Sequence, residues 1–253
     1  MDKHKVWFPF SENVETEQDG VMVFCFHHAG GSAAVYKKWT DINDRNISFI
    51  PIELPGKGCR IDEEPICDMK KLTDQIAEAI EEFSDGRKIV FYGHSMGAAI
   101  AFKTAHTMQT YCDTKPELLI VSGRHSPCIS IEDRYTTDMD DSMLLKELKV
   151  MGGTPKEILE NKELMDFLLP RVKSDYKLNE SFVYNGEIIG IPIEAYAGSK
   201  DFDATYEMMD EWENVTTIGM TKKEFQGEHF FPFDLGKEYE LELKTHIYHQ
   251  VQD

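Results

Sequence analysis

The feature that most constrains this chain is an alternation of short apolar runs with longer segments of helical character. Short apolar runs predict buried strands at Val21–His27, Ile47–Leu54, Lys88–Tyr92 and Leu118–Ser122. The segments between them predict helices at Ser32–Asn43, Asp68–Phe83 and Met96–Gln109. Strands separated by helices form parallel β-α-β units with right-handed crossovers. The first half of the chain therefore predicts an α/β fold.

The alternation stops near Ser130 and resumes near Ile191. The intervening stretch has no convincing strand and predicts helical pieces at Asp140–Val150, at Glu157–Leu169 and from Pro170 onward. The final part predicts strands at Ile191–Ala197 and Lys222–Phe225, and helices near Ala204–Glu213 and Leu235–Val251. We predict one domain over residues 1–253, a mostly parallel central sheet flanked by helices, with a helical lid over about residues 125–185.

Composition excludes several classes of function. The 253 residues hold 27 basic and 46 acidic side chains, a net charge of −19, which argues against binding nucleic acid or anionic membranes. No apolar stretch approaches the roughly 20 residues that span a bilayer, and the N-terminal residues lack the apolar core of a secretion signal. The five cysteines are odd in number and widely spaced, so we expect a reduced, cytoplasmic protein.

The segment VFYGHSMGAAIAF holds a G-x-S-x-G motif centred on Ser95, directly between a predicted strand and a predicted helix. That context is required of a nucleophile elbow, in which small neighbours allow a sharp turn that exposes the serine above the sheet. Gly93 and Gly97 supply the small neighbours. A surface serine in a glycine turn is the alternative, but the flanking elements favour Ser95 as the nucleophile.

A serine nucleophile needs a base, and in this architecture the triad runs Ser, acid, His along the chain. His246 and His249 lie in the C-terminal helix, whereas His229 follows a short strand in the loop FQGEHFFPF, which we expect to be exposed, so His229 is the predicted base. Asp201, just beyond the strand at Ile191–Ala197, is the predicted acid. Asp203 is its competitor, although we expect it to cap the next helix.

The segment FCFHHAGGSA follows the first strand, where this architecture places part of an oxyanion hole. We predict that the backbone amides of Ala29 and Met96 are the two oxyanion donors, with His28 and Gly30 as alternatives to Ala29. Adjacent side chains of an extended segment point to opposite faces, so His27 and His28 cannot form one metal site. We expect neither a metal nor a bound cofactor.

In these segments the chain resembles the stand-alone (type II) thioesterases of nonribosomal peptide and polyketide synthases. The resemblance extends over residues 21 to 235, and its most discriminating part is LKVMGGTPKEILENKELMDFLLPRVKSDYKLNESF, at Leu148–Phe182. It implies an α/β-hydrolase fold, a Ser95, Asp201 and His229 triad, and Ala29 and Met96 as oxyanion donors. The chain departs from the family pattern where GEH replaces the common GGH and where PGKGCR replaces PGHGxR or PGRxxR.

The resemblance also implies that the protein hydrolyses acyl groups from the phosphopantetheine arm of carrier proteins, mostly to clear misprimed or stalled units. A carboxylesterase acting on small esters is the second interpretation, and a non-catalytic scaffold is the third. Because carrier proteins are also usually acidic, docking would need a local basic or apolar patch. The candidate basic residues are Lys37, Lys38, Lys57, Arg60, Arg124, Arg171 and Lys173. A monomer is the default expectation.

Overall fold

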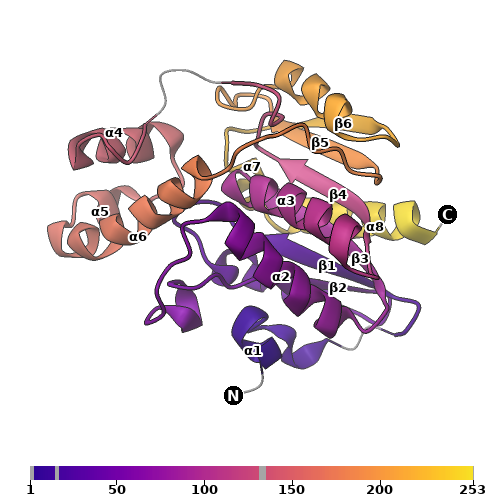
Figure 1. Ribbon diagram of the computed structural model, residues 1–253. Coiled ribbons are helices and arrows are strands. Elements are labelled where there is room, and N and C mark those ends of the chain that lie inside the picture. The colour runs from indigo at the N-terminus through magenta and orange to yellow at the C-terminus, as the bar shows by residue number, and fades with distance from the viewer. Residues whose placement is uncertain (1–2, 15–16, 131–134, 253) are drawn as a thin grey trace.

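The computed structural model describes residues 3–14, 17–130 and 135–252 (Figure 1). Its strands are β1 (Val21–Phe26), β2 (Ile47–Pro51), β3 (Lys88–His94), β4 (Pro116–Ser122), β5 (Ile193–Gly198) and β6 (Met220–Phe225). They form one sheet in the order β2-β1-β3-β4-β5-β6, and each of these neighbouring pairs is parallel. The predicted parallel α/β sheet is thus confirmed, with strand ends shifted by at most a few residues.

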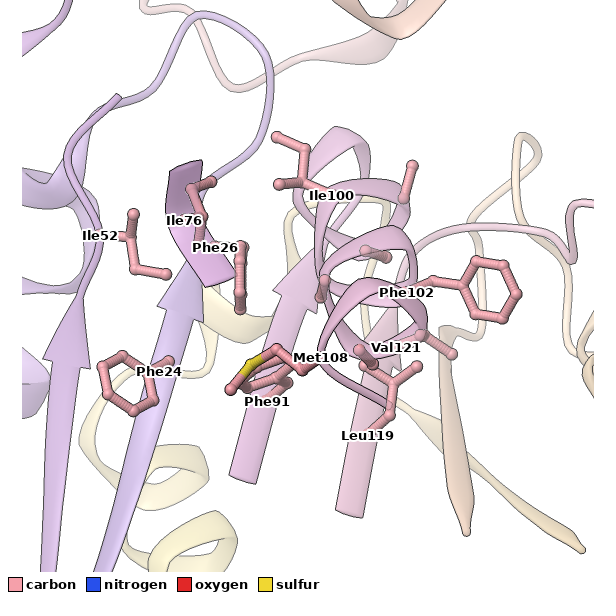
Figure 2. Close-up of a cluster of buried hydrophobic side chains, with 14 of the residues drawn as sticks. Phe24, Phe26, Ile52, Ile76, Phe91, Ile100, Phe102, Met108, Leu119 and Val121 are labelled. Carbon is pink, nitrogen blue, oxygen red and sulfur yellow. The ribbon is translucent and has the colours of Figure 1, made fainter. Parts of the chain in front are cut away.

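Both faces of the sheet are covered by helices, which explains why its strands are continuous apolar runs. Helices α2 (Met69–Ser84) and α3 (Met96–Tyr111) cover one face, and α8 (Lys237–Gln252) lies behind the sheet in Figure 1. Alternate residues of a strand enter separate cores: Phe24 packs on the α2 and α3 side, whereas Val23 packs on the α8 side. Figure 2 shows the first of these cores.

Several shorter elements depart from the sequence prediction. The segments predicted as helices at Ser32–Asn43 and Ala204–Glu213 form the 3₁₀ helices η2 (Ala33–Ile42) and η4 (Glu207–Val215). Four short elements were not predicted: α1 (Lys3–Trp7), η1 (Ser11–Asn13), η3 (Gly58–Arg60) and α7 (Phe231–Asp234). Each has at most five residues, too few for a helical period to appear in the sequence. No helix in the described part of the chain is long and apolar enough to cross a membrane.

The segment between β4 and β5 is helical, as predicted, and projects beyond the sheet in Figure 1. Its helices are α4 (Asp141–Met151), α5 (Lys156–Leu159) and α6 (Lys162–Glu180). We call this segment, residues 135–180, the helical cover; residues 131–134 of the predicted lid lie outside the described residues. Apolar side chains of the cover form a third buried cluster of their own.

The helix boundary that we predicted at Pro170 is wrong. The chain breaks earlier, where the Asn161 side chain accepts a hydrogen bond from the Leu164 backbone amide at 3.1 Å and so caps the start of α6. Helix α6 then continues through Pro170, although an interior proline costs about 3 kcal/mol. Burial of Val172 and Leu178 on the same helix offsets that cost.

The strand order places a binding edge next to β1. β2 and β3 lie on opposite sides of β1, so the loops after β1 and β3 leave the carboxyl edge of the sheet in diverging directions. Ligands of open α/β sheets bind in the crevice at such a switch point. Phe26 pairs with Gly93 in register, so the loop that begins at His27 starts beside the turn that carries Ser95.

Candidate active site

Ser95 sits on a strained turn between β3 and α3. Its backbone has φ 54° and ψ −118°, a conformation that costs a non-glycine residue about 1–3 kcal/mol. The turn is possible because its neighbours lack side chains: a Cβ on Gly97 would lie 2.0 Å from the Phe26 carbonyl oxygen, and one on Gly93 would lie 2.4 Å from the Gly97 oxygen. The Ser95 amide also donates to the Ser122 carbonyl at 2.8 Å. Ser95 thus has the geometry of a nucleophile elbow.

Asp201 and His229 are brought together at the ends of β5 and β6. The Nδ1 atom of His229 lies 2.9 Å from Oδ2 of Asp201, so the ring donates its Nδ1 proton and Nε2 remains a proton acceptor. The other carboxylate oxygen of Asp201 accepts from the backbone amides of Asp203 and Ala204 at 2.9 and 3.2 Å. Three hydrogen bonds fix the carboxylate, which in turn fixes the imidazole.

Two details of the sequence prediction are wrong. Asp203 does not cap the following helix, because η4 begins at Glu207 with Tyr206 before it, and Asp203 instead donates its backbone amide to Asp201. His229 was expected in an exposed loop, yet only 2% of it is exposed. The rings of His94 and Phe230, with centroids 5.1 and 5.2 Å from that of His229, help to bury it.

Three other histidines near the site are neutral: His27 and His94, which are buried, and His28, which is half-buried. Burial lowers the pKa of His27 to about 3 and that of His28 to about 4, and it lowers the pKa of His94 well below its usual value. The Nδ1 atoms of His27 and His28 lie 2.8 and 2.9 Å from the carbonyl oxygens of His28 and Ala29. These contacts make the pair a frame for the loop, and no metal-binding cluster of side chains occurs among the described residues.

The structure narrows the choice of oxyanion donor in the loop after β1. The backbone amide of Gly30 donates to Asp175 Oδ2 at 2.7 Å, and that of Gly31 donates to the His28 carbonyl at 3.1 Å. Gly30 is therefore already engaged, which disfavours it as a donor to substrate. Ala29, like Ser95, borders both cavities at the site, and Met96 borders one of them.

Two cavities meet at Ser95 and Ala29 beneath the helical cover. The larger has a volume of about 270 Å³ and also contains His229 and Phe230. Its far wall is mostly apolar and comes from the cover: Leu148, Met151, Pro155, Ile158, Met165, Leu168 and Val172. The smaller, of about 80 Å³, is bordered by charged and polar side chains that include Arg124, Asn179 and Asp203. The apolar lining of the first cavity is of the kind that suits an acyl chain.

The sequence did not reveal that Asp175, on α6 of the helical cover, contacts the turn after β2. Lys57, expected at a docking surface, is instead buried in an ion pair with Asp175 at 2.6 Å. Arg60 is also buried, with its guanidinium bonded to Glu63 and to the Glu53 carbonyl. Lys57, in the PGKG turn, and Asp175 are 118 residues apart in the sequence, so no local pattern signals their contact.

Known proteins match both the sequence and the fold. A family model for the thioesterase domain matches residues 22–240. The chain is 32% identical over 220 residues to the gramicidin S biosynthesis protein GrsT of Aneurinibacillus migulanus, with 87% of this chain and 85% of that protein aligned.

Among solved structures, the type II thioesterase BorB from the borrelidin biosynthetic cluster matches with a TM-score of 0.80 at 25% identity, over 95% of this chain and 97% of that chain. The type II thioesterase YbtT from the Yersiniabactin NRPS/PKS biosynthetic pathway matches with a TM-score of 0.80 at 27% identity, over 92% and 95%. The chain belongs to the thioesterase domain family, as a thioester hydrolase of the type II kind with the α/β-hydrolase fold.

Proposed function

We propose that this thioesterase removes acyl groups from the phosphopantetheine arm of carrier proteins in nonribosomal peptide or polyketide biosynthesis, and so clears misprimed or stalled units. The observation that carries the proposal is the apolar cavity of about 270 Å³ that joins Ser95 and His229 beneath the helical cover. The relatives support the pathway, since their names place them in gramicidin, borrelidin and Yersiniabactin biosynthesis.

In the proposed mechanism, Ser95, His229 and Asp201 form the triad. Nε2 of His229 takes the proton of the Ser95 hydroxyl, whose oxygen attacks the thioester carbonyl. Asp201 holds the ring in the required tautomer and stabilises its protonated form through the 2.9 Å contact at Nδ1. The thiol then leaves with the proton, and a water molecule activated by the same histidine hydrolyses the acyl-enzyme.

The backbone amides of Ala29 and Met96 stabilise the oxyanion in both steps. Ala29 lies at the junction of the cavities, and Met96 is the first residue of α3, where the helix dipole favours negative charge. Preorganised donors of this kind contribute about 10²–10³ to the rate. The mechanism uses only protein groups, so we propose that it needs no metal and no resident cofactor.

The carrier protein is the proposed partner. Because this chain has a net charge of −19, its docking surface for an acidic carrier protein must be locally basic or apolar. Burial removes Lys57 and Arg60 from the set of docking candidates, and Arg124 and Lys173 are engaged by Asn179 and Asp141. Lys37 and Lys38, exposed on η2, remain, and so does Arg171, which stacks on Phe167 of α6 with 3.8 Å between its guanidinium carbon and the ring centroid. Reversal of these three charges tests the docking site.

We further propose a monomeric cytoplasmic enzyme that acts as one domain over residues 1–253, with the lid at about 125–185. All five cysteines are free thiols, as a reducing compartment requires. The helical cover and the sheet edge line the same cavity, which supports their action as one unit.

The test is release of an acyl group from a carrier protein loaded with hexanoyl-phosphopantetheine, beside hexanoyl-N-acetylcysteamine and p-nitrophenyl hexanoate. Ser95→Ala is the matched control, because it removes the nucleophile and leaves the cavity. We expect Ser95-dependent hydrolysis with a much higher kcat/KM on the carrier protein than on either small ester. Rapid turnover of the p-nitrophenyl ester with the loaded carrier ignored would instead identify a carboxylesterase.

A further inference from the structure

A buried ion pair connects the helical cover to the loop after β1. Asp175 of α6 and Lys57 of the PGKG turn are 5% and 7% exposed at their side chains, and 2.6 Å separates Lys57 Nζ from Asp175 Oδ2. The same carboxylate oxygen accepts the backbone amide of Gly30 at 2.7 Å. Lys57 also donates to the Arg171 carbonyl at 3.2 Å, so it contacts α6 twice.

We propose that Asp175 is a positioning residue for the oxyanion hole, and that it acts by holding the peptide between Ala29 and Gly30. This inference rests on the proposed role of the Ala29 amide as an oxyanion donor. It adds a function to α6, which forms a wall of the acyl cavity and also orients the backbone that stabilises the transition state.

Both polar ends of the peptide between Ala29 and Gly30 are held by side chains. Asp175 accepts the Gly30 N–H, and Nδ1 of His28, a ring kept neutral by burial, lies 2.9 Å from the Ala29 carbonyl. Two opposed hydrogen bonds fix the rotation of a planar peptide group. The Ala29 amide lies one residue earlier on the same backbone, so its direction depends on that orientation.

Lys57 compensates the negative charge that Asp175 would otherwise place beside the proposed oxyanion hole. An uncompensated negative charge beside the oxyanion hole would oppose the negative charge that develops on the substrate oxygen. The lysine neutralises Asp175 at 2.6 Å, and both side chains are shielded from water. The pair therefore supplies a strong hydrogen-bond acceptor to Gly30 without a net charge. Removing only one partner would leave a buried unpaired charge, which is strongly destabilising.

The decisive comparison uses two double variants that lack the ion pair and differ only in the acceptor. Lys57→Met/Asp175→Asn retains a side-chain oxygen for the Gly30 amide, whereas Lys57→Met/Asp175→Leu has similar volume and no acceptor. Ser181→Ala is the matched control for anchoring of α6, because the Ser181 hydroxyl accepts the Met69 amide of α2 at 2.8 Å and lies outside the site. Should the leucine variant fail to fold, Lys57→Met/Asp175→Ala replaces it.

Each variant is assayed with hexanoyl-N-acetylcysteamine, with a hexanoyl trifluoromethyl ketone that forms a tetrahedral adduct on Ser95, and with the corresponding amide as a ground-state ligand. We expect the leucine variant to have a kcat about 10- to 100-fold below that of the asparagine variant, with KM unchanged. Affinity for the ketone should fall in parallel, while affinity for the amide stays constant. Ser181→Ala should match the parent.

Equal kcat values in the asparagine and leucine variants would overturn the inference, and so would equal losses of affinity for the ketone and the amide. These results are distinct from failure of the proposed function. If the parent shows no hydrolysis that Ser95→Ala abolishes, the proposed triad itself is refuted. If the parent is active and the two double variants are alike, only the role of Asp175 is refuted.

Discussion

Replacement of Gly97 by alanine perturbs the nucleophile elbow by a single methyl group. A Cβ at this position would lie 2.0 Å from the Phe26 carbonyl oxygen, 2.5 Å from its carbonyl carbon and 2.8 Å from the His27 oxygen. All three atoms belong to the backbone at the end of β1, which pairs with β2 and β3 on its two sides. Rotation of a flexible side chain therefore cannot relieve the clash.

The magnitude follows from these distances. Cβ atoms in proteins almost never approach another heavy atom within 3.0 Å, so α3 and β1 must separate by about 1 Å. Met96 and Ser95 immediately precede the substituted residue, and they move with it, while Ala29 stays on the β1 side. A misplacement of about 1 Å can lower a rate about 100-fold. Overpacking should also reduce the free energy of unfolding by about 1–3 kcal/mol.

The assay is kcat/KM for hexanoyl-N-acetylcysteamine, together with the melting temperature. Gly190→Ala is the matched control, because the nearest atom to its Cβ would be Oε1 of the Gln109 side chain at 3.3 Å, in an exposed segment. We expect the control to retain parental activity. A Gly97→Ala variant with parental kcat/KM would refute the idea that contact between α3 and β1 aligns the proposed oxyanion donors with Ser95.

Three further substitutions test separate parts of the molecule. Asp201→Asn should lower kcat for the same thioester about 10³–10⁴-fold with little change in melting temperature, because an amide does not favour the Nδ1–H tautomer of the base; a loss below tenfold would contradict this. Ile158→Trp fills the far wall of the acyl cavity, so kcat/KM should fall for octanoyl but not for acetyl thioesters, and equal losses would contradict the placement of the chain. The hydrogen bond to Glu194 raises the pKa of His246. The stability that this pair contributes is therefore complete below the unfolded-state pKa of about 6.5, and it is lost as pH rises through the higher pKa of the folded state. Urea unfolding between pH 5 and 9 should therefore show a steeper loss of stability in the parent than in His246→Gln, whereas the exposed-site control His249→Gln should follow the parent.

The sequence predicted what depends on local chemistry. A glycine-flanked serine between an apolar run and a helical run can form few structures other than an elbow, and the observed φ of 54° at Ser95 agrees. His229 was selected because it followed the last strand in the chain, and the structure places it against Asp201. Chain order and strand ends were sufficient for both, because the carboxyl ends of parallel strands share one edge of the sheet.

Contacts between distant segments were not predictable in the same way. Lys57 looked like a surface lysine because its partner, Asp175, lies 118 residues away in the sequence. Pro170 looked like a helix end, although tertiary burial of α6 decides otherwise. Asp203 resembled a helix N-cap, but the next helix is a 3₁₀ helix that begins later, at Glu207.

The strand order also explains two glycines that no motif identifies. His229 follows β6, three strands away from β3, and neighbouring strands lie about 4.8 Å apart, so its loop must turn back across β5 and β4 by roughly 14 Å to reach Ser95. Gly198 at the end of β5 permits this crossing, because a Cβ there would lie 2.5 Å from the Glu228 carbonyl oxygen. Gly123, just after β4 at φ 58°, would place a Cβ 2.7 Å from Cε1 of the His94 ring, which packs against His229. The absence of side chains at the ends of β4 and β5 is therefore a requirement of the proposed triad geometry, and it becomes apparent only once the order of the strands is known.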